Sequence, residues 1–261
     1  MPLCTWYKDC INIITIPFSL ACLGSNKRAI EKARTLDVDC ILLDLEDATA
    51  PTAKNSARVT VADALQSDFG SRQVVVRVNS LTTEWGFADV EMVANSSNAA
   101  AVLLPKVNRP SEVHALETAL GPSGSHLSIW CMIETPAGVL HALDIAQSSE
   151  RISALVAGVV DLGNELHAVY RKDRLPLISS LSSIVLSARA ASSPSRSLAA
   201  IDGVFLSLDD PQGFREECQQ VSSLVLCNRA LCRPVSLPPL AALQRGGTWV
   251  STGSASSTRP L

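Results

Sequence analysis

The stretch at residues 127–136, LSIWCMIETP, decides the fold, because an apolar run ends there in a glutamate and Thr135-Pro136 then opens a helix. The same order of apolar run, charged residue and helical pattern recurs between about residues 17 and 220. Uninterrupted apolar runs are typical of strands that are buried on both faces of a parallel sheet. Their alternation with amphipathic stretches predicts βαβ units and therefore an α/β fold.

Working outward from this stretch, we predict further strands and the helices between them. The predicted strands are 38–45, 74–78, 99–104, 127–133, 152–157 and 200–206, with a weaker one at 16–23. The predicted helices are 53–67, 84–94, 110–120, 135–146, 177–191 and 211–220. This number of units favours a TIM-type (β/α)8 barrel over a doubly wound sheet, and no strand is followed by a glycine-rich phosphate-binding loop.

Charged side chains follow the predicted strands at intervals of about one βα unit, roughly 30 residues. They are Glu46 with Asp47, then Arg77, Lys106, Glu134 and Asp161, and after a longer gap Asp209 with Asp210. The carboxyl ends of barrel strands converge on one mouth, so these side chains are expected to meet in a single charged site.

Two carboxylates at the ends of adjacent strands, Glu134 and Asp161, suit a hard cation such as Mg²⁺. They could instead form an acid–base pair, or each could simply cap the next helix, since Glu134-Thr135-Pro136 is also a helix start. Arg77 lies inside an apolar strand, where a guanidinium needs anionic partners. Its expected partners are the acidic cluster and an anionic substrate.

Composition excludes several classes of function. The net charge is −3, only 4% of the 261 residues are aromatic, and no basic run is present, so we expect no nucleic-acid partner. No apolar run approaches the roughly 18–20 residues of a membrane span, so we expect no membrane partner. The eight cysteines form no CxxC pair and are expected to be buried in a reducing compartment, either cytoplasmic or mitochondrial.

An ordered series of short motifs resembles the citrate lyase beta-subunit family, which includes malyl-CoA and citramalyl-CoA lyases and is aldolase-like (HpcH/HpaI). The series covers about residues 24–220, and its order is more specific than any single motif. It runs through Gly24-Ser25-Asn26, Leu43-Asp44-Leu45-Glu46-Asp47-Ala48, Lys54, Ala57-Arg58, Val76-Arg77-Val78-Asn79, Leu104-Pro105-Lys106, Ile133-Glu134-Thr135-Pro136-Ala137-Gly138, Gly158-Val159-Val160-Asp161-Leu162, Ala200-Ile201-Asp202-Gly203-Val204 and Asp210-Pro211-Gln212-Gly213-Phe214.

The resemblance implies a homo-oligomeric, Mg²⁺-dependent carbon–carbon lyase that cleaves a 3-hydroxyacyl-CoA thioester of the citramalyl, malyl or citryl type to acetyl-CoA and a 2-oxo acid. It implies that Glu134 and Asp161 bind the metal. Arg77 would be the catalytic residue and would also hold the substrate, together with Glu134. Glu46, Asp47 and Lys106 would complete the substrate-binding set.

Both ends of the chain depart from the family pattern. We therefore divide it into a divergent segment 1–23, a barrel domain 24–220 and a divergent tail 221–261 that is expected to be disordered. The chain is either a divergent member or a product of mis-joined coding segments, and we favour the second. On that interpretation the barrel is incomplete at its C-terminal end and lacks strand eight.

Two other functions stay open. The first is a truncated, catalytically inactive homologue that binds ligand or partner subunits. The second is a metal-dependent aldolase that acts on 2-oxo acids without CoA, which would use the same metal chemistry.

Overall fold

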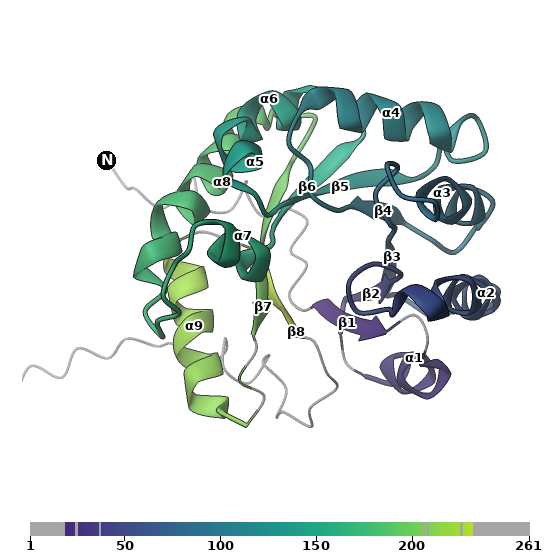
Figure 1. Ribbon diagram of the computed structural model, residues 1–261, viewed down its shortest axis with the longest axis horizontal. Helices are drawn as coiled ribbons and strands as arrows, with labels where there is room; N and C mark the ends of the chain where they lie inside the picture. The colour runs from purple at the N-terminus through teal and green to yellow at the C-terminus, as the bar shows by residue number, and fades with distance from the viewer. Residues whose placement is uncertain are drawn as a thin grey trace, which may run out of the picture.

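The computed structural model describes residues 19–23, 26–36, 38–205, 207, 209–224 and 227–231. Eight strands, all pairing in parallel, follow one another in chain order and close into a barrel, because β1 pairs with both β2 and β8 (Figure 1). The strands are β1 (Ser19–Leu23), β2 (Cys40–Asp44), β3 (Gln73–Arg77), β4 (Ala101–Leu104), β5 (Ser128–Ile133), β6 (Ile152–Ala157), β7 (Ala199–Phe205) and β8 (Cys227–Leu231).

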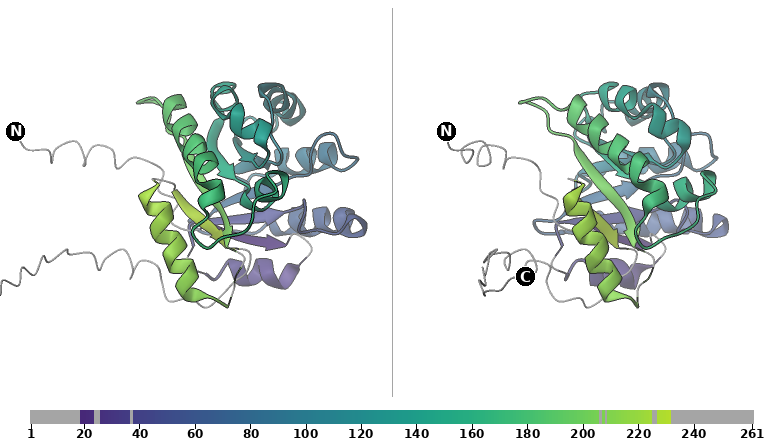
Figure 2. Two further views of the ribbon diagram at one scale, coloured as in Figure 1. Left: turned by 60° about the vertical axis from the view of Figure 1, so that its left-hand side comes forward. Right: turned by 90° about the vertical axis from the view of Figure 1, so that its left-hand side faces the viewer.

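Helices connect the strands and cover the outside of the sheet. They are α1 (Lys27–Ala33), α2 (Lys54–Ala64), α3 (Gly86–Ala94), α4 (Pro110–Leu120), α5 (Pro136–Leu140), α6 (Ala142–Gln147), α7 (Val159–Glu165), α8 (Ile178–Ala191) and α9 (Pro211–Ser223), with short 3₁₀ turns η1 (Pro51–Ala53) and η2 (Leu175–Leu177). Figure 2 shows α8 and α9 running along the outside of the β7 and β8 strands, which they contact. No helix in the described ranges is both long and apolar enough to span a bilayer.

Strand residues alternate between two apolar clusters. On β2, Ile41 and Leu43 belong to the layer between sheet and helices, whereas Cys40 and Leu42 belong to the cluster inside the barrel. Trp130 of β5 also points into the inner cluster. Both faces of each central strand are therefore buried, which is why the strands appear as continuous apolar runs in the sequence. Cys40 and Cys131 are buried, as predicted.

The prediction that the barrel lacks strand eight is wrong for the residues described. Cys227–Leu231 forms β8, which pairs with β7 on one side and β1 on the other. This strand lies inside the segment 221–261 that the motif comparison treated as a tail. The sequence there, Leu224–Leu231, is still rich in apolar residues, and strand pairing through the backbone needs no family motif. Residues 1–18 and 232–261 lie outside the described residues.

One predicted helix is divided in two. The stretch predicted as a single helix over 135–146 forms α5 and α6, with a break at His141, where φ is −102° and ψ is 10°. Gly138 allows the first turn of α5 to pack closely against the segment that follows β4, because a Cβ at this position would lie 2.5 Å from the Val107 carbonyl oxygen.

Candidate active site at the barrel mouth

Arg77, the last residue of β3, is held by the acidic residues of the neighbouring strand. Its Nε and Nη2 donate to the two carboxylate oxygens of Asp44, the last residue of β2, at 2.7 and 2.5 Å. Its Nη1 lies 3.2 Å from Glu46 Oε2. Burial by itself lowers the pKa of Arg77, but the hydrogen bond and charge of Asp44 and the charge of Glu46 outweigh it and raise the pKa. The expectation that acidic partners surround Arg77 is confirmed.

Glu134 follows β5 and is almost fully buried, at 2% exposure. Burial raises the pKa of its carboxyl to about 7, and the nearby charges of Glu46 and Asp161 act in the same direction. The Lys106 backbone N–H donates to Glu134 Oε1 at 2.8 Å. Gly158 lies against the same side chain, and a Cβ at that position would be 2.5 Å from Glu134 Oε2.

Lys106 follows β4 and joins the remaining carboxylates. Its Nζ lies 3.6 Å from Glu46 Oε1, 3.8 Å from Asp47 Oδ2 and 3.6 Å from Asp161 Oδ2. Asp161 stands in the first turn of α7, directly after β6. The structure therefore brings all six of the residues predicted for the site to one end of the barrel: Glu46, Asp47, Arg77, Lys106, Glu134 and Asp161.

Asp210 does not share this environment, although its position after β7 suggested that it would. Its carboxylate accepts from the Gly213 backbone N–H at 2.8 Å and pairs with Lys172 at 3.0 Å. This is the geometry of a residue that holds the start of α9. Asp210 is therefore a helix cap, whereas Glu134 accepts from the backbone N–H of Lys106, which follows β4.

Three polar residues below the mouth, Asp44, Lys54 and Asn79, stand in the motif series but were given no role in the predicted site. Asp44 accepts two hydrogen bonds from Arg77, as described above. Lys54 is buried, and its Nζ donates to the carbonyls of Leu45 and Glu46 and to Asn79 Oδ1, at 2.8, 2.8 and 2.7 Å. Burial lowers the pKa of Lys54. A signal for Asp44 was present, because an acid at the end of one apolar strand and a base at the end of the next are natural partners.

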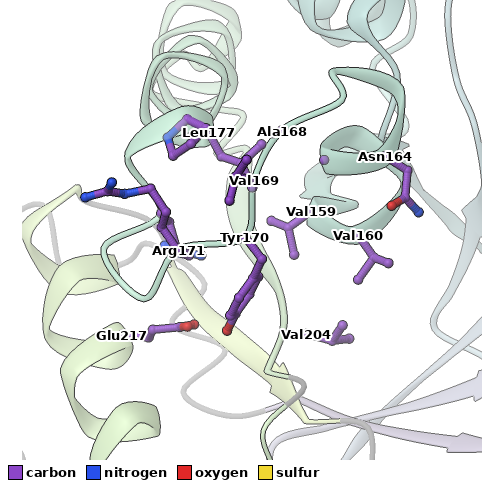
Figure 3. A pocket seen from close by; sticks show the side chains of 13 residues that line it. Val159, Val160, Asn164, Ala168, Val169, Tyr170, Arg171, Leu177, Val204 and Glu217 are labelled. Carbon is purple, nitrogen blue, oxygen red and sulfur yellow. The ribbon is translucent and has the colours of Figure 1, made fainter.

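A separate cavity of about 260 Å³ lies between α7, β7 and α9. Figure 3 shows Tyr170 and Glu217 facing this cavity from different elements, with valines along its wall. None of the six predicted site residues lines it, although Val160 precedes Asp161. The cavity is therefore a neighbour of the charged mouth and not the mouth itself.

Comparison with known proteins agrees with this geometry. Residues 19–232 match the HpcH/HpaI aldolase/citrate lyase family. The chain belongs to this family. The match includes β1 and β8, so it extends beyond the 24–220 range that the motifs indicated.

Two related enzymes illustrate the family. The chain is 40% identical over 215 residues to a (3S)-malyl-CoA thioesterase of Cereibacter sphaeroides, which covers 82% of this chain and 72% of the relative. It is 30% identical over 219 residues to the citrate lyase subunit beta of Leuconostoc mesenteroides subsp. cremoris, covering 81% and 70%. Both relatives have enzyme names, one a thioesterase of a CoA ester and the other a subunit of citrate lyase.

A solved structure is similar over most of the chain. The CitE protein of Mycobacterium tuberculosis, in complex with magnesium, acetoacetate and coenzyme A, has a TM-score of 0.70 and 26% identity. The match covers 85% of this chain and 78% of that protein. A relative with the same fold therefore holds magnesium together with a small oxo acid.

The residues at the mouth fit magnesium. Mg²⁺ commonly takes one or two protein carboxylates and completes an octahedron with water and substrate oxygens. Glu134 and Asp161 follow adjacent strands, and the charge of Asp161 adds to burial, the larger cause, in raising the pKa of Glu134. Among the described residues, no three or more His, Cys, Asp or Glu side chains are grouped to hold a metal.

Proposed function

We propose that this protein is a Mg²⁺-dependent carbon–carbon lyase with a TIM-type (β/α)8 barrel, and that it cleaves a 3-hydroxyacyl-CoA thioester. The observation that carries the proposal is the buried Glu134 carboxylate at the end of β5, which accepts from the Lys106 N–H and whose pKa responds to the charges of Asp161 and Arg77. The magnesium, oxo acid and coenzyme A held by the related CitE protein support the choice of ligands.

In this proposal Glu134 and Asp161 hold the metal, which when bound polarises the oxygens of the hydroxy acid portion of the substrate. The hydroxyl on carbon 3 gives its proton to a base or to solvent and becomes a carbonyl, the bond between carbons 2 and 3 of the acyl chain breaks, and its electron pair passes to the thioester as an enolate. Protonation of that enolate gives acetyl-CoA, and the other fragment leaves as a 2-oxo acid. Citramalyl-, malyl- and citryl-CoA are substrates of this type.

Arg77 stabilises the negative charge that develops on the thioester oxygen. Asp44 fixes two nitrogens of the guanidinium, so the group is oriented before substrate arrives. Glu46, Asp47 and Lys106 line the mouth and position the anionic part of the substrate. Preorganised charge of this kind needs no rearrangement during the reaction.

A second candidate is hydrolysis of a CoA thioester, and the malyl-CoA thioesterase at 40% identity favours it. Hydrolysis gives free CoA and the intact hydroxy acid, whereas the lyase reaction gives acetyl-CoA and a 2-oxo acid. The two reactions are separated by their products from one substrate.

The test is incubation with malyl-CoA and with citramalyl-CoA, with Mg²⁺ or with EDTA, followed by measurement of acetyl-CoA, free thiol and 2-oxo acid. We expect the wild type to form acetyl-CoA and 2-oxo acid in a reaction that depends on Mg²⁺. In Glu134→Ala we expect the formation of these products to show no dependence on Mg²⁺. Glu91→Ala, which changes an exposed glutamate of α3, is the matched control. Free thiol without 2-oxo acid would establish the thioesterase, and no product from either ester would overturn both.

We also propose that the protein is a homo-oligomer. Leu140, Val169 and Leu186 are 83%, 76% and 69% exposed on the single chain. Large apolar side chains grouped at a surface are typical of contact sites between proteins, and Val169 has three apolar neighbours in the same segment, Leu166, Tyr170 and Leu175.

A further inference from the structure

Lys106 occupies the centre of the acidic mouth. Its ammonium lies within 3.6–3.8 Å of carboxylate oxygens of Glu46, Asp47 and Asp161, which come from the ends of β2 and β6. The lysine itself comes from the end of β4. One flexible cation therefore balances acidic groups from two other strands.

The backbone at Lys106 is held in an unusual conformation. Its φ is 52°, in the left-handed region that non-glycine residues rarely adopt. The Lys106 N–H donates to Glu134 Oε1 at 2.8 Å, and Asn108 Nδ2 donates to the Lys106 carbonyl at 2.9 Å. These bonds fix the turn, and backbone strain that is held in this way is often tied to function. The turn places one residue against Glu134 through its backbone and against Asp161 through its side chain.

We propose that Lys106 is a built-in counter-cation, whose ammonium balances the mouth carboxylates in the metal-free protein and must leave them when a divalent cation binds. This inference rests on the proposed function, because it concerns the same two metal ligands. Mg²⁺ lies 2.0–2.1 Å from its oxygen ligands. An ion on Asp161 would therefore lie close to an ammonium that is 3.6 Å from that same carboxylate, and two cations at such a distance repel strongly.

Lys106 is able to make this exchange. Its side chain is 46% exposed, so it can turn toward solvent without disturbing the core. The buried Glu134 cannot turn away in the same manner, because Gly158 and the Lys106 N–H enclose it. Of the two proposed metal ligands, Glu134 is therefore held in place, whereas the lysine that pairs with the other, Asp161, can move. Once displaced, the ammonium is free to meet the anionic part of the substrate at the mouth.

The test is isothermal titration calorimetry of the full-length protein with MgCl₂ and with MnCl₂, at constant pH and ionic strength. We expect Lys106→Met to bind either metal at least about tenfold more tightly than wild type, because the competing cation is gone. Lys106→Arg keeps the cation and should bind like wild type. Lys32→Met is the matched control, since Lys32 is exposed in the last turn of α1, at the end of the barrel opposite the mouth.

Each result decides something. Equal or weaker metal affinity in Lys106→Met overturns the inference, and if wild type binds metal the proposed function survives. If Lys32→Met gains as much metal affinity as Lys106→Met, the effect is due to net charge, and this result would also overturn the inference. Metal binding by Lys106→Arg that is as tight as in Lys106→Met would contradict the role of Lys106 as a competing cation. If wild type does not bind and Lys106→Met does, the inference is supported; if neither binds, both the inference and the metal-dependent function fail. Lys106→Gln provides a second neutral variant, and thermal unfolding verifies that each variant is folded.

Discussion

Arg77 is a half-buried cation, with 15% of its side chain exposed. Asp44 accepts from two of its nitrogens in a fork, and Nη1 contacts Glu46 Oε2 at 3.2 Å and Met132 Sδ at 3.6 Å. A lysine ammonium is a point charge and cannot reproduce this fork. The identity of the cation, and not only its sign, therefore matters at this position.

Arg77→Lys should raise KM and lower kcat for the CoA thioester, reducing kcat/KM by about 100-fold or more, which corresponds to about 3 kcal/mol of lost transition-state stabilisation. Steady-state kinetics with saturating Mg²⁺ measure both constants. Arg28→Lys, on the exposed side of α1, is the control and should change neither. Wild-type kinetics in Arg77→Lys would remove Arg77 from the site.

Glu134 makes the stability of the metal-free protein depend on pH. Its ordinary pKa is 4.5 and burial raises the pKa to about 7 in the native state. Between these values the folded protein holds a proton that the unfolded chain has lost, so the stability contribution is present at low pH and decreases as pH rises through 7. The loss is on the order of 2–3 kcal/mol.

Glu134→Gln removes this titration while keeping the shape of the side chain. In urea unfolding without Mg²⁺, the free energy of unfolding of Glu134→Gln relative to wild type should rise by on the order of 2–3 kcal/mol from about pH 5 to about pH 8. Glu91→Gln should follow wild type across the range. Parallel pH curves for Glu134→Gln and wild type would contradict the raised pKa.

The sequence predicted the six mouth residues because each stands at the end of an apolar run, and parallel strands carry such ends to one rim. It could not predict which charge lies against which. The Asp44–Arg77 fork and the position of Lys106 among three carboxylates depend on side-chain conformation across strands, and no spacing rule reports that. The sequence indicates acidic partners for Arg77 but does not single out Asp44, which stands inside its own apolar run.

At the level of elements, Lys54 connects the start of α2 to the turn after β2. Its three hydrogen bonds hold the carbonyls of Leu45 and Glu46 and the side chain of Asn79. Asn79 also bonds Asp89 of α3, through its backbone N–H at 3.0 Å and through Nδ2, and Asp89 pairs with Arg58 of α2 at 2.6 Å. This buried network fixes the turn that carries Glu46 beneath Arg77.

Lys54→Met should destabilise the protein by about 2–4 kcal/mol, because it leaves buried oxygens without a donor. It should also lower kcat/KM, since the Glu46 turn is no longer fixed. Chemical denaturation and steady-state kinetics measure the two effects. Lys27→Met, which changes an exposed lysine at the start of α1, is expected to have little effect on either. Unchanged stability in Lys54→Met would show that the network does not support the turn.

The sequence predicted the strands that are buried on both faces and the helices between them. It did not predict β8, which carries no family motif. Helix α4 has the predicted bounds, Pro110–Leu120, since a proline at its first position and a glycine after its last mark both ends. The segment of β8 carries no family motif, yet its backbone pairs with β7 and β1. Closing a sheet depends on backbone hydrogen bonds and apolar faces.

At the scale of the whole molecule, closure of the barrel gives the mouth its shape. With β1 paired to β8, no open edge remains among the described strands, and the ends of β2 to β6 are held around a common centre. Residues that arise more than one hundred positions apart, such as Asp47 and Asp161, thereby face the same lysine. A sheet left open at β8 would not restrain these ends in the same manner.

The exposed apolar segment between α7 and α8 lies beside this rim, since α7 also carries Asp161. If copies of the chain associate through it, Val169→Asp places a charge in the contact and should lower the mass measured by light scattering toward the 27.7 kDa of one chain. Val59→Asp changes a residue of similar exposure, 61% against 76%, on α2 and should keep the wild-type mass. A wild type that is monomeric at all concentrations would disprove the assembly. Equal dissociation by both variants would place the contact elsewhere, because charge at any surface position would then suffice.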